Sequence, residues 1–261
     1  MRLVRFQVEG RSAHGILRGD EIAELAGDFL GSFRTVTKSH PLAEVRLLAP
    51  CIPGKIVAVG LNYRDHATEL GFAIPDEPII FLKPPTTVIG PGETILYPAM
   101  SERVDYEAEL GVVIKERVKN ITAGEAKDHI LGYTCANDVT ARDLQKKDGQ
   151  WTRAKSFDTF CPVGPWIETD LNTDDLLVEC YLNGRRRQSS RTSQFIFPVD
   201  YLVSFISKIM TLDHGDLIIT GTPAGIGSMK PGDEVEVRIE GIGSLKNIVS
   251  EVIPAEAGIQ M

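Results

Sequence analysis

The sequence lacks several features that would set a chain of 261 residues apart from ordinary globular proteins. No run approaches the roughly 18 apolar residues that a membrane-spanning helix needs. The first ten residues, MRLVRFQVEG, alternate apolar and charged side chains and lack the continuous apolar stretch of a signal peptide. Repeats of fixed period and low-complexity segments are also missing. We therefore expect a globular protein that does not interact with membranes.

Long basic tracts and paired cysteines are missing as well. The formal net charge is -8, and no basic stretch is long enough to indicate nucleic-acid binding. The spacing of the cysteines is typical neither of zinc sites nor of redox motifs; they are Cys51, Cys135, Cys161 and Cys180. We interpret the chain as a reduced, cytoplasmic protein with mostly buried thiols and no nucleic-acid partner.

One basic cluster interrupts this pattern, at Arg185, Arg186 and Arg187. It directly follows Asn183-Gly184, a pair of residues that strongly favours a tight hairpin turn. The position indicates an exposed loop tip rather than a site for a polyanion.

Composition and pattern divide the chain into unequal parts. Residues 1–50 form short alternating segments, and the prolines at 50 and 53 precede a change to a continuous apolar strand. We predict a small N-terminal α+β domain over residues 1–50 and a larger domain over 51–252. Residues 253–261 carry no core pattern and are expected to form a flexible tail.

Short strand-like runs outnumber helical patterns in the larger part. The runs are 55–60, 78–83, 109–114, 163–168, 176–182, 216–220 and 233–240. Helical patterns cover 62–70, with Asn62 as the expected cap and Gly71 as the stop, and 140–147 and 199–210. Because strands do not alternate regularly with helices, the pattern predicts a mostly β fold with some α rather than a doubly wound α/β sheet.

The segment VDYEAELGVVI, residues 104–114, reads as a strand that carries two glutamates inside an apolar run. Side chains alternate faces on a strand, so Glu107 and Glu109 share a face, roughly 6–7 Å apart. Their repulsion costs on the order of 2–3 kcal/mol at an effective dielectric of about 20. Either water or a cation must offset it. Asp105 is expected at the solvated end of the same face.

A third acid, Asp138, lies where an apolar segment turns into a helical pattern. Functional side chains are often displayed at such corners, although Asp138 taken alone favours a turn or capping role over a functional one. Three carboxylates without a convergent His or Cys suit Mg²⁺, Mn²⁺ or Ca²⁺, and zinc is not expected.

His66 and Glu69 are neighbours on one face if residues 62–70 are helical. A carboxylate beside an imidazole raises its basicity and fixes its tautomer, which suits a general base. A surface His–Glu pair is the alternative.

Further candidates follow Asp138 in the sequence. Arg142 and Gln145 share a helix face and offer donors for a carboxylate, or they are plain surface residues. Lys155 stands among apolar residues, where a functional role and an ion pair with Asp158 are both open. Thr222 lies in the Gly/Thr turn of IITGTPAGIG, whose backbone N–H groups and hydroxyl are able to hold an anion. The turn lacks the lysine of a P-loop.

Taken in order, these stretches resemble the fumarylacetoacetate hydrolase family over roughly residues 52–250. The matching stretches are GLNYRDHATE, PIIFLKPPTTVIGPGE, VDYEAELGVVI, GYTCANDVTARDLQ, RAKSFDTFCPVGPWI, LNGRRRQSSRTSQFIF and GDLIITGTPAGIG with KPGDEVEV. The first 50 residues are similar to the small N-terminal domain of many bacterial members. The three arginines depart from the acidic or mixed turn of many relatives and would favour a more anionic substrate if that turn approaches the site.

The resemblance implies a β-roll or folded-sandwich catalytic domain and a homodimer. It implies a divalent cation, Mg²⁺ or alternatively Mn²⁺ or Ca²⁺, at Glu107, Glu109 and Asp138. The same resemblance implies catalytic roles for His66, Glu69 and Lys155. The positions that it implies for substrate contact are Arg142, Gln145, Thr222, Phe81 and Lys83.

The function implied is hydrolysis of a C–C bond in a 2,4-dioxo acid of the acylpyruvate kind, through an enolate that the metal stabilises. In this reading His66 activates water, Glu69 orients the imidazole and Lys155 stabilises charge or donates a proton. The runner-up is an isomerase or decarboxylase acting on 2-hydroxyhepta-2,4-dienedioate, from aromatic catabolism, or on oxaloacetate. A β-sandwich that binds Ca²⁺ without catalysis is the remote alternative, and it leaves His66 and Lys155 without a role.

Overall fold

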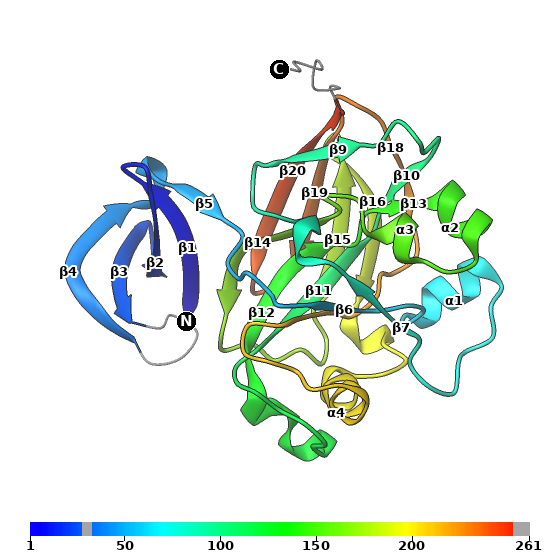
Figure 1. Cartoon of the computed structure of the whole chain (residues 1–261), viewed down its shortest axis with the longest axis horizontal. Coiled ribbons are helices and arrows are strands. Elements are labelled where there is room, and N and C mark those ends of the chain that lie inside the picture. The colour runs from blue at the N-terminus through cyan, green and yellow to red at the C-terminus, as the bar shows by residue number, and fades with distance from the viewer. Residues whose placement is uncertain (28–32, 253–261) are drawn as a thin grey trace, which may run out of the picture.

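The computed structural model describes residues 1–27 and 33–252, and their strands form three sheets (Figure 1). The largest has twelve strands, in the order β4-β3-β2-β1-β14-β12-β11-β17-β6-β7, with β5 paired to β1 and β8 to β14. Its strands are β1 (Arg2–Val8), β2 (Arg11–Arg18), β3 (Glu21–Gly27), β4 (Phe33–Pro41), β5 (Arg46–Leu48), β6 (Ile56–Val59), β7 (Ile80–Lys83), β8 (Val88–Ile89), β11 (Ala108–Ile114), β12 (Ile130–Asn137), β14 (Cys161–Glu168) and β17 (Leu217–Ile219). The prediction of a mostly β fold with some α is confirmed.

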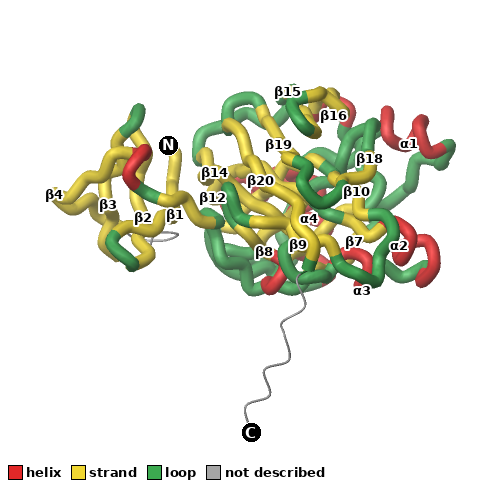
Figure 2. Tube along the Cα trace, turned by 90° about the horizontal axis from the view of Figure 1, so that it is seen from above, coloured by secondary structure: helices red, strands yellow, loops and turns green. Residues whose placement is uncertain are grey.

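Two smaller sheets accompany the large one. The five-stranded sheet has the order β16-β15-β19-β20-β9, and the three-stranded sheet has the order β13-β10-β18. Their strands are β9 (Thr94–Tyr97), β15 (Leu177–Leu182), β16 (Arg185–Arg191), β19 (Glu234–Ile239) and β20 (Gly243–Glu251), and β10 (Val104–Tyr106), β13 (Thr140–Ala141) and β18 (Gly227–Met229). In Figures 1 and 2, β19 and β20 lie beside β12 and β14, so the two larger sheets face each other.

The helices are short and connect the strands. They are α1 (Arg64–Leu70), α2 (Arg142–Asp148), α3 (Thr152–Lys155) and α4 (Val199–Ile209), with 3-10 turns η1 (Leu42–Glu44), η2 (Pro85–Thr87), η3 (Ala123–His129) and η4 (Thr192–Gln194). In Figure 1, α1, α2 and α3 gather at the end of the molecule opposite β1–β4.

The main core lies between the large sheet and the five-stranded sheet. Every residue of β11 is buried, because this central strand is covered on both faces, and such strands read as continuous apolar runs. Leu110 and Val112 contribute to this core from β11, and Val178 and Val237 join them from the five-stranded sheet. The buried strand gives the acids near its start a rigid support.

The first strands extend the large sheet rather than standing apart from it. β1 pairs with β14 through Arg2 opposite Glu168 and Leu3 opposite Ile167. A separate small core, which includes Val4, Phe6 and Ile22, packs on these strands. The division of the chain at residue 50 stays a prediction, and the tail predicted at 253–261 lies outside the described residues.

The segment 104–114 is not one strand, as the sequence suggested, but two. β10 belongs to the three-stranded sheet and β11 to the large sheet, with Glu107 at the break. Side chains satisfy the backbone there: Glu107 N–H donates to Asn137 Oδ1 at 2.9 Å, and Ala108 N–H donates to Gln188 Oε1 at 3.0 Å. The break turns Glu107 away from a regular strand path without leaving a buried donor unpaired.

Helix α1 confirms one expected boundary and corrects the other. Gly71 ends it in the left-handed conformation, as predicted. Asn62 does not cap it, since the helix begins after Tyr63 and the Asn62 side chain is used elsewhere. That side chain donates to the carbonyls of Phe197 and Thr220 and accepts the Phe197 N–H, which ties α1 to the main core.

Other local predictions agree with the structure. Asn183 and Gly184 have φ angles of 52° and 73° and join β15 to β16, and the arginines that follow them are exposed. All four cysteines are free and buried. Among the described helices, none is both long and apolar enough to cross a membrane.

Candidate active site

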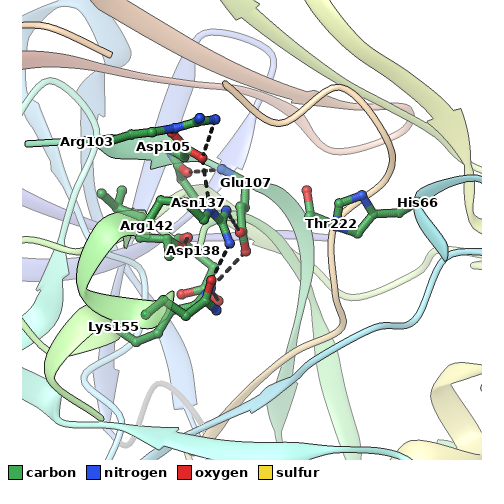
Figure 3. Close-up of polar contacts among 12 residues, drawn as sticks. His66, Arg103, Asp105, Glu107, Asn137, Asp138, Arg142, Lys155 and Thr222 are labelled. Carbon is green, nitrogen blue, oxygen red and sulfur yellow. Dashed lines mark hydrogen bonds and ion pairs between the residues drawn. The ribbon is translucent and has the colours of Figure 1, made fainter. Parts of the chain in front are cut away.

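A cavity of about 540 Å³ collects most of the residues that the sequence singled out. Its lining comes from α1, α2, α3, the ends of β6 and β7, and the turn after β17. The predicted site residues that line it are His66, Glu69, Phe81, Glu107, Arg142, Gln145, Lys155 and Thr222. In Figure 3, His66 and Thr222 lie on one side, and Glu107, Asp138, Arg142 and Lys155 lie on the other.

Three buried carboxylates form the centre of the site. Glu107 lies at the break between β10 and β11, Glu109 on β11, and Asp138 between β12 and β13. One oxygen of each lies within 4.8 Å of the others, and the three residues are at most 6% exposed. The sheet therefore brings together, from distant parts of the chain, the acids that the sequence proposed as a cluster.

Two lysines neutralise part of this cluster. The Lys155 ammonium on α3 donates to Glu107 Oε2 at 2.8 Å and to Asp138 Oδ2 at 2.5 Å. The Lys83 ammonium donates to the other oxygen of Asp138, also at 2.5 Å, and its side chain has no solvent exposure. Lys155 thus pairs with these acids and not with Asp158, which was the alternative.

The pKa values of Glu107 and Glu109 are shifted in opposite directions. Burial alone would raise the pKa of Glu107, but the positive charges of Lys155 and Arg142 outweigh it and lower its pKa to about 2. For Glu109, burial and the negative charges of Asp138 and Glu107 raise the pKa well above its usual value. Lys155 keeps a raised pKa despite burial, because Asp138 and Glu107 hold its charge.

Glu109 is the carboxylate that the protein leaves uncompensated. It accepts the Gly221 N–H at 2.7 Å, and no ammonium or guanidinium group in the described part of the chain lies within ion-pair distance of it. An all-oxygen cluster with a surplus acid suits a hard divalent cation. The residues present therefore fit a divalent metal held by Glu107, Glu109 and Asp138.

The His66–Glu69 pair predicted on α1 forms at the cavity wall. His66 Nδ1 lies 2.9 Å from Glu69 Oε2. An ionised carboxylate only accepts hydrogen bonds, so we infer that Nδ1 carries the proton and that Nε2 keeps its lone pair. The pair has the arrangement of a general base with an orienting acid.

Two contacts hold this pair in place. The Gly225 N–H donates to Glu69 Oε1 at 3.0 Å. Gly225 has φ +98°, and a Cβ there would lie 2.3 Å from the Arg187 carbonyl oxygen, so the position requires glycine. On the other side of α1, Asp65 accepts the Ser190 hydroxyl at 2.5 Å, which fastens the helix to β16.

Arg142 lies in the cavity wall, but its donors are used inside the protein. Nε donates to Asp105 at 2.9 Å, one terminal nitrogen donates to Gln145 Oε1 at 2.6 Å, and the other donates to Glu107. Asp105 is fully buried between Arg103 and Arg142, so the expectation of a solvated residue was wrong. A substrate contact of Arg142 or Gln145 stays a prediction.

Thr222 is likewise committed to protein partners. Its hydroxyl donates to the Ala108 carbonyl at 2.9 Å and accepts Gln188 Nε2 at 2.8 Å. The hydroxyl proton that was expected to hold an anion is therefore engaged, and its substrate contact stays a prediction. Gln188, which is fully buried on β16, ties Thr222 to the strand break beside Glu107.

The two remaining predicted residues separate in the structure. Phe81 lines the cavity, with its ring 5.2 Å from the Trp151 ring centre and 5.2 Å from the Lys155 ammonium. Lys83 is not among the described residues that line the cavity, and its buried ammonium contacts Asp138. Its contribution in the structure is the ion pair with that acid.

Sequence reasoning missed several wall residues. Arg103, Lys146, Trp151 and Phe72 line the cavity, and none was proposed for the site. For Lys146 a signal existed, because it follows Arg142 by four positions and so shares its helix face. Phe72 and Trp151 stand in loops whose course depends on tertiary packing.

Comparison with known proteins identifies the class of protein. The model of the fumarylacetoacetate (FAA) hydrolase C-terminal family matches residues 55–250, and the Rv2993c-like N-terminal model matches residues 1–50. The chain belongs to the fumarylacetoacetate hydrolase family, whose members are enzymes.

Individual relatives cover most of the chain. An uncharacterized protein of Archaeoglobus fulgidus is 57% identical over 81% of this chain and 85% of its own length. The oxaloacetate tautomerase FAHD2B of Bos taurus, a mitochondrial protein, is 44% identical over 80% of this chain and 71% of its own.

Solved structures agree with the fold. The 2-hydroxyhepta-2,4-diene-1,7-dioate isomerase of Mycobacterium marinum has a TM-score of 0.91 and 46% identity, with 97% and 99% of the two chains covered. Maleylpyruvate hydrolase of Sphingobium, in complex with manganese(II) and pyruvate, has a TM-score of 0.80 and 28% identity, with 96% and 99% covered.

Proposed function

We propose that the protein is a divalent-metal-dependent enzyme that converts a small 2-oxo acid through its enolate. One observation carries the proposal: Glu107, a member of the buried carboxylate triad, lines the same cavity as the oriented His66–Glu69 pair. A non-catalytic calcium-binding module would need the acids but would give the histidine pair no task.

A cation held by Glu107, Glu109 and Asp138, for which we propose Mg²⁺ or Mn²⁺, supplies Lewis-acid stabilisation of negative charge on the substrate oxygens. The manganese complex of the Sphingobium relative supports this choice of metals. Ca²⁺ is the further possibility for an all-oxygen donor set.

We assign proton transfer to His66. Its Nε2 is free to take a proton from the substrate or from water, and Glu69 stabilises the imidazolium that results. Lys155 is assigned the stabilisation of negative charge, because its buried ammonium lies against Glu107 and Asp138 in the cavity wall.

The reaction that needs fewest groups is keto–enol tautomerisation or the related isomerisation. His66 removes a proton from one position of the substrate and returns it to the other, with no further reactant. The oxaloacetate tautomerase and the dioate isomerase among the relatives favour this reaction, and we propose it first.

Hydrolysis of a 2,4-dioxo acid is the second candidate. Here His66 takes a proton from water, the oxygen attacks the distal carbonyl, and the C–C bond breaks with its electrons left in the enolate. The Sphingobium maleylpyruvate hydrolase supports it, and it was the reaction expected first from the sequence. Decarboxylation of oxaloacetate passes through the same enolate.

The test follows enol-to-keto conversion of oxaloacetate by ultraviolet absorbance, with the metal-loaded protein and after chelation. His66→Gln should lower the rate about a hundredfold or more. The control His214→Gln changes an exposed histidine outside the cavity lining and should leave the rate unchanged. Equal rates in both variants would contradict the role of His66. Pyruvate release from acetylpyruvate at a higher kcat/KM than tautomerisation would place hydrolysis first.

The homodimer and the cytoplasmic location also stay predictions. The four free, buried thiols support a reducing compartment. Light scattering after size exclusion measures the oligomeric state.

A further inference from the structure

Asn62 carries a fully buried amide that bonds to two separate segments of the chain. Its Nδ2 donates to the Thr220 carbonyl at 2.7 Å and to the Phe197 carbonyl at 3.2 Å, and its Oδ1 accepts the Phe197 N–H at 2.8 Å. Both amide protons and the amide oxygen are therefore engaged. Asn62 itself is not one of the described residues that line the cavity, so any effect on the reaction passes through the groups that it holds.

The first segment is the turn after β17, which orients Glu109. The Gly221 N–H donates to Glu109 Oε2 at 2.7 Å, and Glu109 has no ammonium partner to fix it instead. Thr220, the residue before, donates to the Leu110 carbonyl through its N–H at 3.1 Å and through its hydroxyl at 3.0 Å. Gly221 has φ +92°, and a Cβ there would lie 2.8 Å from the Asn62 Cβ. Asn62 thus packs against this turn as well as bonding to it.

The second segment leads into the helix that carries His66. The Asn62 carbonyl accepts the Ile196 N–H at 2.8 Å, and the next residue, Tyr63, forms a β-bridge with Phe195. Helix α1 begins directly after Tyr63, whose carbonyl accepts the Ala67 N–H at 2.9 Å. His66 lies in the first turn of this helix, four residues after Asn62. The bonds of Asn62 therefore fix the start of α1.

We infer that Asn62 is a positioning residue that sets the placement of His66 relative to Glu109. One side chain holds both the turn that orients the metal-binding acid and the entry to the helix that carries the base. The inference rests on the proposed function, because it takes Glu109 as a metal ligand and His66 as the group that moves the proton. Without the amide, the two segments lose their shared anchor.

The chain offers a matched control for a test of this role. Asn247 is 2% exposed and donates to the carbonyls of Gly90 and Glu93 at 2.9 Å and 2.8 Å, and it is not among the described residues of the cavity lining. Asn62→Ser and Asn247→Ser each remove a buried amide that bonds to two backbone carbonyls, so both should lower Tm. Only Asn62→Ser should also change the site.

Two measurements on the full chain report on the site. Electron paramagnetic resonance of free Mn²⁺ gives the Kd of the metal, and enol-to-keto conversion of oxaloacetate at saturating Mn²⁺ gives kcat. Because loss of a group that orients a metal ligand commonly costs tenfold or more, Asn62→Ser should raise the Kd about tenfold and lower kcat about tenfold. Asn62→Asp keeps the acceptor for the Phe197 N–H but places an oxygen against the Thr220 carbonyl, and it should raise the Kd by a similar factor.

The outcomes separate the inference from the proposed function. If a folded Asn62 variant matches Asn247→Ser in Kd and kcat and differs from the unmodified protein only in Tm, the inference is overturned while the proposed function stands. Failure of both Asn62 variants to fold, with Asn247→Ser folded, also overturns it, because Asn62 would then hold the fold rather than the site. If the unmodified protein neither binds Mn²⁺ nor converts oxaloacetate, the proposed function fails and the inference fails with it.

Discussion

The ion pair between Lys83 and Asp138 gives a prediction with two opposite effects. Lys83 is fully buried, and its ammonium lies 2.5 Å from a carboxylate that the proposed metal shares. Lys83→Met removes the charge and keeps a side chain of similar length. We expect the metal-free protein to become less stable and its affinity for a divalent cation to rise.

The two magnitudes follow from the geometry. Removal of one partner of a buried pair costs about 3–5 kcal/mol, and the lower end applies because Lys155 still contacts Asp138. In a chain of this size that loss lowers Tm by roughly 6–12 °C. A unit charge 4 Å away contributes about 4 kcal/mol at a dielectric of about 20, so a tenfold lower Kd for the metal, about 1.4 kcal/mol, is a conservative expectation.

Thermal unfolding with and without Mn²⁺ measures both effects. The free energy added by a saturating ligand grows as Kd falls, so Mn²⁺ should raise the Tm of Lys83→Met more than that of the unmodified protein. Lys147→Met, an exposed change on α2, should behave like the unmodified protein. If Mn²⁺ stabilises Lys83→Met no more than the unmodified protein, Lys83 does not oppose the cation and the reasoning is refuted.

Two further predictions concern stability. Arg11 donates to Glu24 and lowers the pKa of Glu24 to about 2. This pair therefore stabilises the fold fully above about pH 4.5, and that stability is lost as the pH falls toward 2. Glu24→Gln should flatten the pH dependence of Tm in this range, and an unchanged slope would contradict the prediction. Gln188→Leu removes a buried hydrogen-bond partner from the Ala108 N–H and another from the Thr222 hydroxyl. Urea unfolding should therefore show that the free energy of unfolding falls by about 2–4 kcal/mol. A fall below about 0.5 kcal/mol would show that other groups replace these bonds.

The elements that depend on local pattern were predictable from the sequence. Runs of apolar and β-branched residues located the strands, and Gly71 and Asn183-Gly184 located a helix end and a hairpin. The carboxylate cluster was also predictable from the sequence, because the repulsion between two glutamates inside an apolar strand is unfavourable unless a cation or water offsets it.

The sequence predictions that proved wrong concern residues whose hydrogen-bond partners lie far away along the chain. Asn62 satisfies its amide with Phe197, 135 residues away, and no local pattern indicates that bond. The strand break at Glu107 depends on acceptors from Asn137 and Gln188. Asp105 is buried because Arg142, 37 residues later, contacts it. Long-range hydrogen bonds of this kind have no periodic signature in a sequence.

The bonds of Gln188 bear on how a family of such enzymes can diversify. Thr222, Gln188 and the Ala108 backbone form one buried unit beside Glu107, so a substitution there alters the position of a metal-binding acid as well as the cavity wall. Lys146 and Phe72 are exposed and support no such unit. Natural variation in substrate preference is therefore expected to accumulate at positions such as these two, while the buried unit stays constrained by selection for a working metal site.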